Sequence, residues 1–152
     1  MVMEACPISN DSRNEPVVRA VAALVAAVTL GAAVLGSYWA SVVLLALAAD
    51  FGIRGFARSR YSPLATLGRM IVNAFGLPPK PVNAGPKRFA ARIGLVMSAS
   101  AAVLFAVGAI DAARAVAGVL VACAMLEAVF ALCVGCKVYA VLPSRVARAL
   151  AR

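Results

Sequence analysis

Two cysteines near the carboxyl end of the chain are the residues best suited to chemistry. Cys133 and Cys136 are separated by two residues, one of them Gly135, and Cys6 is a further thiol near the start of the chain. On a continuous helix, residues i and i+3 lie on one face about 5–6 Å apart, so a disulfide needs only a modest adjustment. The spacing predicts a dithiol that exchanges electrons or sulfur with a partner, with Cys6 as an accessory thiol.

Two other interpretations of these cysteines stay open. They could be small apolar residues that pack a helix end, or metal ligands with Cys6, although the chain has no histidine and no second pair of this spacing. We predict no metal and no cofactor. Thioredoxin-type dithiols sit at the amino end of a helix, whereas we expect this pair near a carboxyl end, where the helix dipole disfavours a thiolate. That placement weighs against exchange chemistry.

Three charged residues inside apolar sequence form a second candidate site. Asp50 and Arg54 are spaced to pair along one helix, and Glu127 falls at a similar depth in a later apolar segment. We expect Arg54 to lie between the two carboxylates, either in a network that fixes helix register or in a proton-accepting, anion or quinone-headgroup site. The 3.6-residue period places Glu127 on a different face from both cysteines, so we expect no direct proton transfer between them.

The composition shows which elements must position these residues. Hydrophobic residues make up 64% of the 152 residues and charged residues 14%, against about half and a quarter in a soluble domain. The net charge of +9 is not arranged with aromatic residues or in a groove-reading motif, which argues against nucleic-acid binding. The chain is therefore predicted to be an all-α, polytopic membrane protein.

Four apolar segments are long enough to cross a bilayer. The uncharged run from residue 20 to residue 49 is too long for one span and is broken at Gly36-Ser37-Tyr38-Trp39; one long tilted helix, giving three spans in all, is the alternative. We predict a four-helix transmembrane domain over residues 17–142, with spans at about 17–36, 39–56, 89–110 and 115–136. A tight turn at 111–114 joins the last two.

The connection between the second and third spans carries a short helix. Ser62 and Pro63 have the residue types of an N-cap and first helical position, and the segment 63–76 has one apolar face and one polar face. It is too short to span, so we expect it to lie in the interface with Arg69 toward lipid phosphates. Lys87, Arg88 and Arg92 add basic interfacial residues to the same connection.

Charge predicts the orientation. With four spans, 14 of the 15 Lys and Arg residues lie on one side, and Arg114 is the exception. Positive charge marks the cytoplasmic side. The polar segment 1–16 and the basic tail 143–152 are therefore expected in the cytoplasm, with the chain in the inner membrane of a bacterium.

An ordered set of segments resembles a family of small bacterial four-helix membrane proteins known as a domain of unknown function. The segments are Cys6-Pro7, Asp50-Phe51 with Arg54, 62–65, 86–91, Leu126-Glu127-Ala128 and the most specific one, Cys133-Val134-Gly135-Cys136-Lys137-Val138-Tyr139. The resemblance covers nearly the whole chain. It implies four membrane helices, no established activity, and association with thioredoxin-like or rhodanese-like proteins.

The leading functional hypothesis is a membrane thiol-redox or sulfur-handling component. Its expected partners are the lipid bilayer and a cytosolic thioredoxin-like or rhodanese-like protein, and a homo-oligomer is compatible with the sequence. The first alternative is a non-catalytic assembly subunit. The second is a small oligomeric transporter that uses Arg54 and Glu127 near the membrane midplane.

Overall fold

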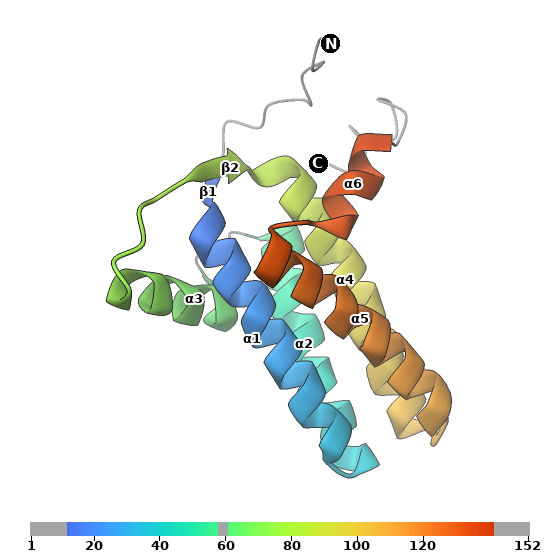
Figure 1. The fold of residues 1–152 in the computed structure, drawn as a ribbon. Helices are drawn as coiled ribbons and strands as arrows, with labels where there is room; N and C mark the ends of the chain where they lie inside the picture. The colour runs from blue at the N-terminus through green and yellow to red at the C-terminus, as the bar shows by residue number, and fades with distance from the viewer. Residues whose placement is uncertain (1–11, 58–60, 142–152) are drawn as a thin grey trace.

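Four long helices form the body of the protein, which was analysed as a computed structural model (Figure 1). The structure describes residues 12–57 and 61–141. The long helices are α1 (Glu15–Val34), α2 (Ser37–Phe56), α4 (Ala84–Ala106) and α5 (Ile110–Phe130). The short elements are β1 (Ser12–Asn14), α3 (Pro63–Ala74), β2 (Pro81–Asn83) and α6 (Val134–Val141). The predicted all-α architecture with four apolar spans is confirmed.

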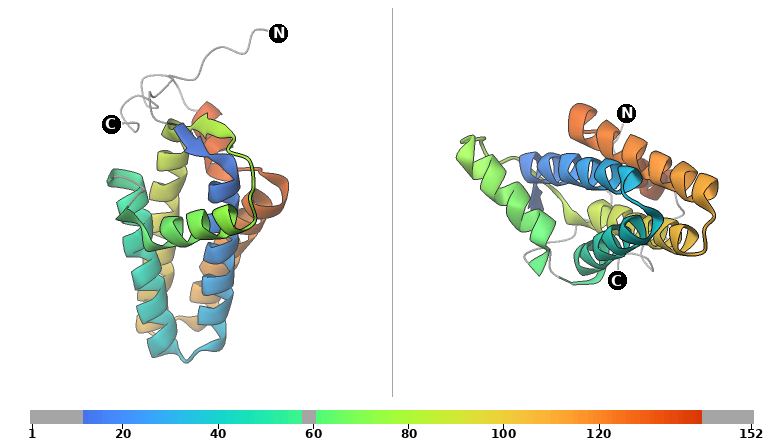
Figure 2. Two further views of the ribbon diagram at one scale, coloured as in Figure 1. Left: turned by 90° about the vertical axis from the view of Figure 1, so that its left-hand side faces the viewer. Right: turned by 90° about the horizontal axis from the view of Figure 1, so that it is seen from below.

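The four long helices run alternately up and down and form a bundle (Figures 1 and 2). Helix α1 packs beside α2 and α5, and α4 packs beside the same two helices. The α2–α4 pair makes the most extensive contact of the fold. Helices α1 and α4 therefore lie diagonally opposite each other, so side chains of all four long helices can point into the centre of the bundle.

Each long helix is 20 to 23 residues long, and 20 helical residues extend about 30 Å. This length matches the hydrocarbon core of a bilayer. Large apolar side chains such as Leu45, Val96 and Val119 are exposed on the outside of the bundle, where lipid would cover them. Tyr38 and Trp39 are exposed at the α1–α2 hairpin, as expected for aromatic residues at the headgroup layer. The chain is a membrane protein.

Two hairpins close the end of the bundle away from α6. The first is Leu35-Gly36, so α1 and α2 are separate helices and the alternative of one long tilted helix was wrong. The second is residues 107–109, earlier than the predicted turn at 111–114. Gly108 has a φ of 80°, which glycine adopts at no steric cost, so α4 ends there. Asp111 falls in the first turn of α5, where the helix dipole stabilises a negative charge.

Small residues allow the helices to approach closely. A Cβ added to Gly94 of α4 would lie 2.5 Å from the Phe51 ring of α2, so this glycine is where the ring packs against α4. Two buried hydroxyl groups of the long helices bond to carbonyls of their own helix. Thr29 donates to the carbonyl of Val25 at 2.8 Å, and Ser98 donates to that of Gly94 at 2.6 Å, so neither leaves an unpaired polar atom in an apolar core.

Helix α3 lies across the bundle axis (Figures 1 and 2). As predicted, Ser62 is its N-cap, accepting a hydrogen bond from the Ala65 amide at 3.1 Å, with Pro63 following. Its buried residues are Ala65, Gly68 and Val72, and α1 is the helix on which α3 packs. The larger apolar residues Leu67, Met70, Ile71 and Phe75 remain exposed. This arrangement fits a helix that lies in the membrane interface.

A two-stranded antiparallel sheet was not predicted. Strand β1 pairs with β2 in the register Ser12–Asn83 and Asn14–Pro81. Lys80 Nζ and Glu15 Oε2 are 2.8 Å apart, and the amide of Glu15 donates to the carbonyl of Lys80 at 2.8 Å. Three-residue strands have too little periodicity to be recognised. The sheet fixes the start of α1 against the start of α4, which begins at Ala84, one turn before the predicted Phe89.

The first and last spans are joined by an arginine. Arg19 of α1 donates from Nε to the carbonyl of Ala128 at 2.9 Å and from Nη2 to that of Val129 at 3.0 Å. These carbonyls belong to the last turn of α5, where no helical amide follows to bind them. Arg19 therefore caps α5 from a neighbouring helix, and its charge favours the negative end of the α5 dipole.

Candidate functional site: a dithiol beside a basic cavity

The helix that carries Glu127 stops before it reaches the cysteines. Helix α5 ends at Phe130, and Ala131 is left-handed with a φ of 54°. The amides of Ala131 and Leu132 both donate to the carbonyl of Leu126, the second at 3.2 Å, and these bonds close the last turn of α5. The predicted continuous span to Cys136 was therefore wrong. Alanine is not a typical residue at such a position, and this is why the helix break could not be recognised from the residue types.

The two cysteines lie at the start of the next helix. Cys133 immediately precedes α6, which begins at Val134. Its sulfur accepts a hydrogen bond from the amide of Cys136 at 3.3 Å, and its carbonyl accepts one from the amide of Lys137 at 3.1 Å. Cys133 thus occupies the N-cap position. The expectation that this pair sits at a helix carboxyl end was wrong, and so was the objection to a thiolate built on it.

The local interactions shift the pKa values of the two thiols in opposite directions. The Cys136 thiol donates to the Cys133 sulfur and lowers the pKa of Cys133, and Lys87 and the Cys136 amide act in the same direction. Burial and the Glu127 carboxylate oppose this shift. The same hydrogen bond, together with burial, raises the pKa of Cys136. Cys133 is therefore the thiol of the pair that loses its proton more readily.

Helix α6 is held against α4 by two contacts. A Cβ at Gly135 would lie 2.8 Å from the Ala90 Cβ, so only glycine allows the two backbones to come this close. Four residues along, the Tyr139 ring packs on Phe89 with centroids 5.5 Å apart, and Tyr139 is 3% exposed. Packing against α4, rather than continuity with α5, therefore positions the dithiol.

Asp50 and Arg54 form a buried ion pair in α2. Arg54 Nε lies 2.9 Å from Asp50 Oδ2, and the two side chains are 10% and 6% exposed. The other carboxylate oxygen, Oδ1, accepts from Ser62 Oγ at 2.6 Å and from the Leu64 amide at 3.3 Å. Asp50 thus ties α2 to the amino end of α3, where a negative charge is favourable.

Glu127 pairs with Lys87 of α4 instead of sharing Arg54 with Asp50. Both side chains are about four-fifths buried, at 17% and 18% exposure. The role of Lys87 was missed because the third span was predicted to begin after it, whereas Lys87 lies in the first turn of α4. Of the other residues predicted to be interfacial, Arg92 donates to the Gly55 carbonyl at 3.3 Å, and Arg69 donates to Thr66 Oγ1 at 2.9 Å.

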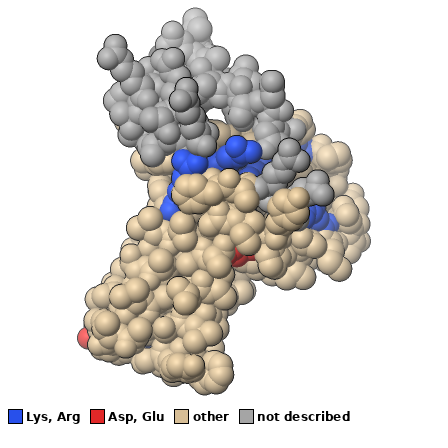
Figure 3. All heavy atoms as spheres, turned by 180° about the vertical axis from the view of Figure 1, so that it is seen from behind, with Lys and Arg blue, Asp and Glu red and all other residues tan. Residues whose placement is uncertain are grey.

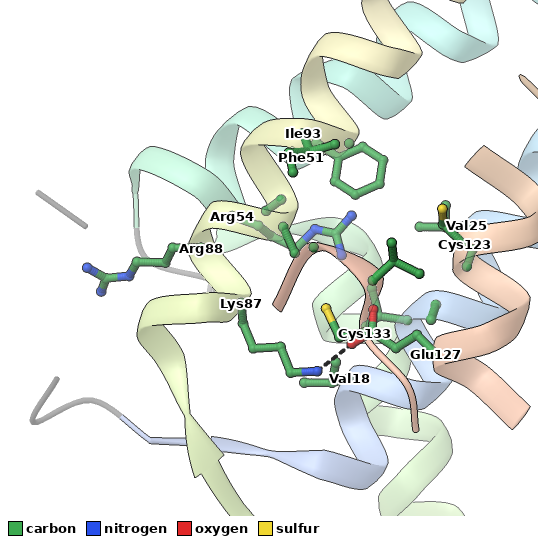
Figure 4. A pocket seen from close by; sticks show the side chains of 18 of the residues that line it. Val18, Val25, Phe51, Arg54, Lys87, Arg88, Ile93, Cys123, Glu127 and Cys133 are labelled. Atoms are coloured by element: carbon green, nitrogen blue, oxygen red, sulfur yellow. Dashed lines mark hydrogen bonds and ion pairs between the residues drawn. The ribbon is translucent and has the colours of Figure 1, made fainter. Parts of the chain in front are cut away.

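One cavity of about 900 Å³ brings the two predicted sites together (Figure 4). Arg54, Lys87, Glu127 and Cys133 all line it, as do Cys123 and Arg88. The expectation that Glu127 and the cysteines point in different directions was wrong for Cys133. It assumed one continuous helix, whereas α5 ends at Phe130 and the left-handed residue Ala131 changes the direction of the chain before Cys133. Cys133 and Lys87 also line a shallower groove on the outside, together with Cys136 and Lys137.

The basic side chains gather at the end of the molecule that holds this site (Figure 3). Among the described residues, no group of three or more His, Cys, Asp or Glu side chains is placed to hold a metal ion. Cys6 lies outside the described residues, as do the basic tail and most of the polar amino-terminal segment. The described part of the site therefore consists of a dithiol, two ion pairs and the cavity between them.

Comparison with known families identifies the chain. The model of a domain of unknown function, DUF4395, matches residues 14–143. The chain belongs to the DUF4395 family. The matched segment of this DUF4395 protein includes every site residue discussed above except Cys6, and the resemblance seen in the sequence is confirmed. Neither curated proteins nor solved structures gave a match.

Proposed function

We propose that this DUF4395 protein is a membrane thiol-exchange component in which Cys133 is the attacking thiol and Cys136 the resolving thiol. The Cys133 thiolate attacks a disulfide of a thioredoxin-like or rhodanese-like partner, forming a mixed disulfide and releasing one partner thiolate. Cys136 then attacks the Cys133 sulfur, which releases the second partner thiolate. The partner gains two electrons, the pair becomes a disulfide, and the proton of Cys136 passes to a departing thiolate. The reverse sequence oxidises the partner.

The observation that carries this proposal is the place of the pair at the amino end of α6. Backbone amides and the helix dipole favour a thiolate there, as in thioredoxin-type dithiols. The hydrogen bond from Cys136 adds to this preference and leaves the second cysteine protonated. The outer groove lined by Cys133 and Cys136 offers a partner a route to the sulfur atoms. Lys87 and Lys137, which also line the groove, would attract an acidic partner surface.

The dithiol is proposed to face the cytoplasm of a bacterium, in its inner membrane. The support is the excess of Lys and Arg at the end of the bundle that carries α6 (Figure 3). Cysteine-labelling with a reagent that does not cross the membrane tests this orientation. Label should reach Cys136 only after the cells are opened, and a cysteine placed at Gly36, in the opposite hairpin, should react in intact cells.

The exchange reaction is tested by trapping thiols in intact cells with an alkylating mass tag, with and without a mild oxidant. We expect Cys133 and Cys136 to become protected together and to recover after reduction. Cys123→Ser is the matched control, because Cys123 also lines the cavity but belongs to α5. Cys136→Ser should accumulate a mixed disulfide between Cys133 and its partner.

The competing function is a structural one, since Cys133 is buried at 8% exposure and caps a helix. If both thiols stay reduced and react with the tag after oxidation, the exchange proposal fails. Loss of the folded protein in Cys133→Ser would also favour the structural role. Serine caps a helix at least as well as cysteine does, so the variant lacks only the packing of the sulfur atom.

A further inference from the structure

The cavity has a mainly apolar wall and one charged end. Its volume is about 900 Å³, which is at the upper end of the range for small-molecule sites. Val25, Phe51, Met97 and Leu120 are among the residues that line the wall, and they come from α1, α2, α4 and α5. The charged end lies between Arg54 and the Lys87–Glu127 pair (Figure 4). An occupant that matches both parts would have a polar head and an apolar body.

Arg54 is the residue that points to a ligand. Its side chain is 10% exposed, and its guanidinium points into the cavity (Figure 4). Asp50 engages Nε of Arg54 in the ion pair at 2.9 Å, whereas Nη2 has no hydrogen-bond partner within the described residues. The Asp50 side chain cannot rotate to accept a hydrogen bond from Nη2 without losing the bonds that Ser62 and Leu64 donate to its Oδ1. A buried donor on a charged group that is left without an acceptor destabilises the protein, so a bound acceptor would be favourable here.

The charges around the cavity favour an anion. Five basic residues line it, namely Arg13, Arg54, Arg69, Lys87 and Arg88. Glu127 in the lining and Asp50 behind Arg54 supply two negative charges, which leaves an excess of three positive charges. Glu127 is already paired with Lys87, and the Asp50 charge is shared with the amino end of α3. A planar guanidinium with a free edge is suited to two oxygens of a carboxylate or of a phosphorus or sulfur oxyanion.

We infer that the cavity binds an amphiphilic anion, with its oxyanion head on Arg54 and its hydrocarbon body against Val25, Phe51 and Leu120. The same chemistry is found in an anionic lipid that enters from the bilayer and in a soluble organic acid with an apolar body. This site does not depend on the proposed thiol exchange, because no electron or sulfur transfer is involved in binding. Its position beside Cys133 means that an occupant would also shield that sulfur from the cavity side.

Binding of radiolabelled oleate to the purified full chain in a non-ionic detergent tests the inference. Saturable binding is expected for the wild type and for Cys136→Ser, which disables the resolving step of the exchange reaction at a residue that does not line the cavity. Arg54→Gln is expected to bind at least tenfold more weakly. Because that variant leaves Asp50 without its partner, the double variant Asp50→Asn/Arg54→Gln, which removes both charges at similar volume, is measured as well. Lys80→Gln is the control, since Lys80 is exposed at the same end and does not line the cavity.

Competition identifies the source of the ligand. Displacement by hexanoate, which is short and soluble, indicates a soluble organic acid. Displacement by phosphatidylglycerol and not by hexanoate indicates a bilayer lipid. The inference is overturned if oleyl alcohol, which has the same chain without the charge, displaces oleate as well as oleate itself does. It is also overturned if the folded double variant binds oleate with wild-type affinity, or if the wild type shows no saturable binding.

Discussion

The contact between Gly135 and Ala90 gives a sharp test of how the dithiol is positioned. In Gly135→Ala the new Cβ would lie 2.8 Å from the Ala90 Cβ and 2.9 Å from the Ala90 Cα. Carbon atoms in ordinary contact are about 3.5–4.0 Å apart, so α6 must move away from α4 by roughly 0.7 Å. Because one of the two atoms belongs to the α4 backbone, a side-chain rotation cannot relieve the contact. Overpacking of this kind costs about 1–3 kcal/mol.

The assay is thermal unfolding of the purified protein in detergent, combined with the rate of disulfide formation between Cys133 and Cys136. Gly135→Ala is expected to melt lower, by on the order of 5 °C, and to change the oxidation rate, because Cys133 moves relative to Lys87. Gly118→Ala is the matched control: nothing lies within 4 Å of a Cβ at that exposed helical position. It should be stabilised by about 0.5–1 kcal/mol through helix propensity.

A second variant, Ala90→Gly/Gly135→Ala, removes the closer of the two contacts and leaves the one to the Ala90 Cα. It should therefore recover part of the lost stability and no more. The reasoning is refuted if Gly135→Ala melts at the wild-type temperature and oxidises at the wild-type rate. That outcome would mean that α6 is not packed on α4 at this point.

Three further predictions concern the thiols and the helix packing. The alkylation rate of Cys133 should rise with pH and level off at a lower pH than for an ordinary cysteine, because the pKa of Cys133 is lowered and the reactive thiolate exists above that pKa. Cys136→Ala should move the midpoint of this pH profile upward, because it removes the hydrogen-bond donor. Cys136→Ser keeps a hydroxyl donor and should move the midpoint less. Ala131→Gly should raise the free energy of unfolding by about 1 kcal/mol, and with it the melting temperature, because Ala131 is left-handed and glycine adopts that conformation without strain. An unchanged or lower melting temperature would contradict the left-handed helix end. Gly94→Ala should destabilise the bundle by about 1–3 kcal/mol, since the Cβ would lie 2.5 Å from the Phe51 ring, and restoration of the wild-type melting temperature by Phe51→Leu in the same chain would trace the effect to this contact.

The spans and α3 could be predicted from the sequence because their signals are long or chemically specific. A run of 30 uncharged residues must leave water, and Ser62-Pro63 has a physical reason to begin a helix. The break at Ala131 could not be predicted, because no glycine or proline marks it and the surrounding residues are as apolar as the span. That single error placed Cys133 on the wrong face and at the wrong end of a helix. The Glu127–Lys87 pair was missed for a related reason, since it depends on where α4 starts.

The Arg19 contact has a consequence for how the chain is assembled. Helix α1 leaves the ribosome before α5, and the carbonyls that Arg19 binds belong to Ala128 and Val129, more than a hundred residues later. Until α5 is in place, this guanidinium has to be solvated by water or lipid phosphates at the membrane surface, which holds the start of α1 at the interface. Arg19 thus obtains its bonds only after α2 and α4 have been made, and a chain truncated after α4 is expected to remain an open, protease-sensitive three-helix intermediate.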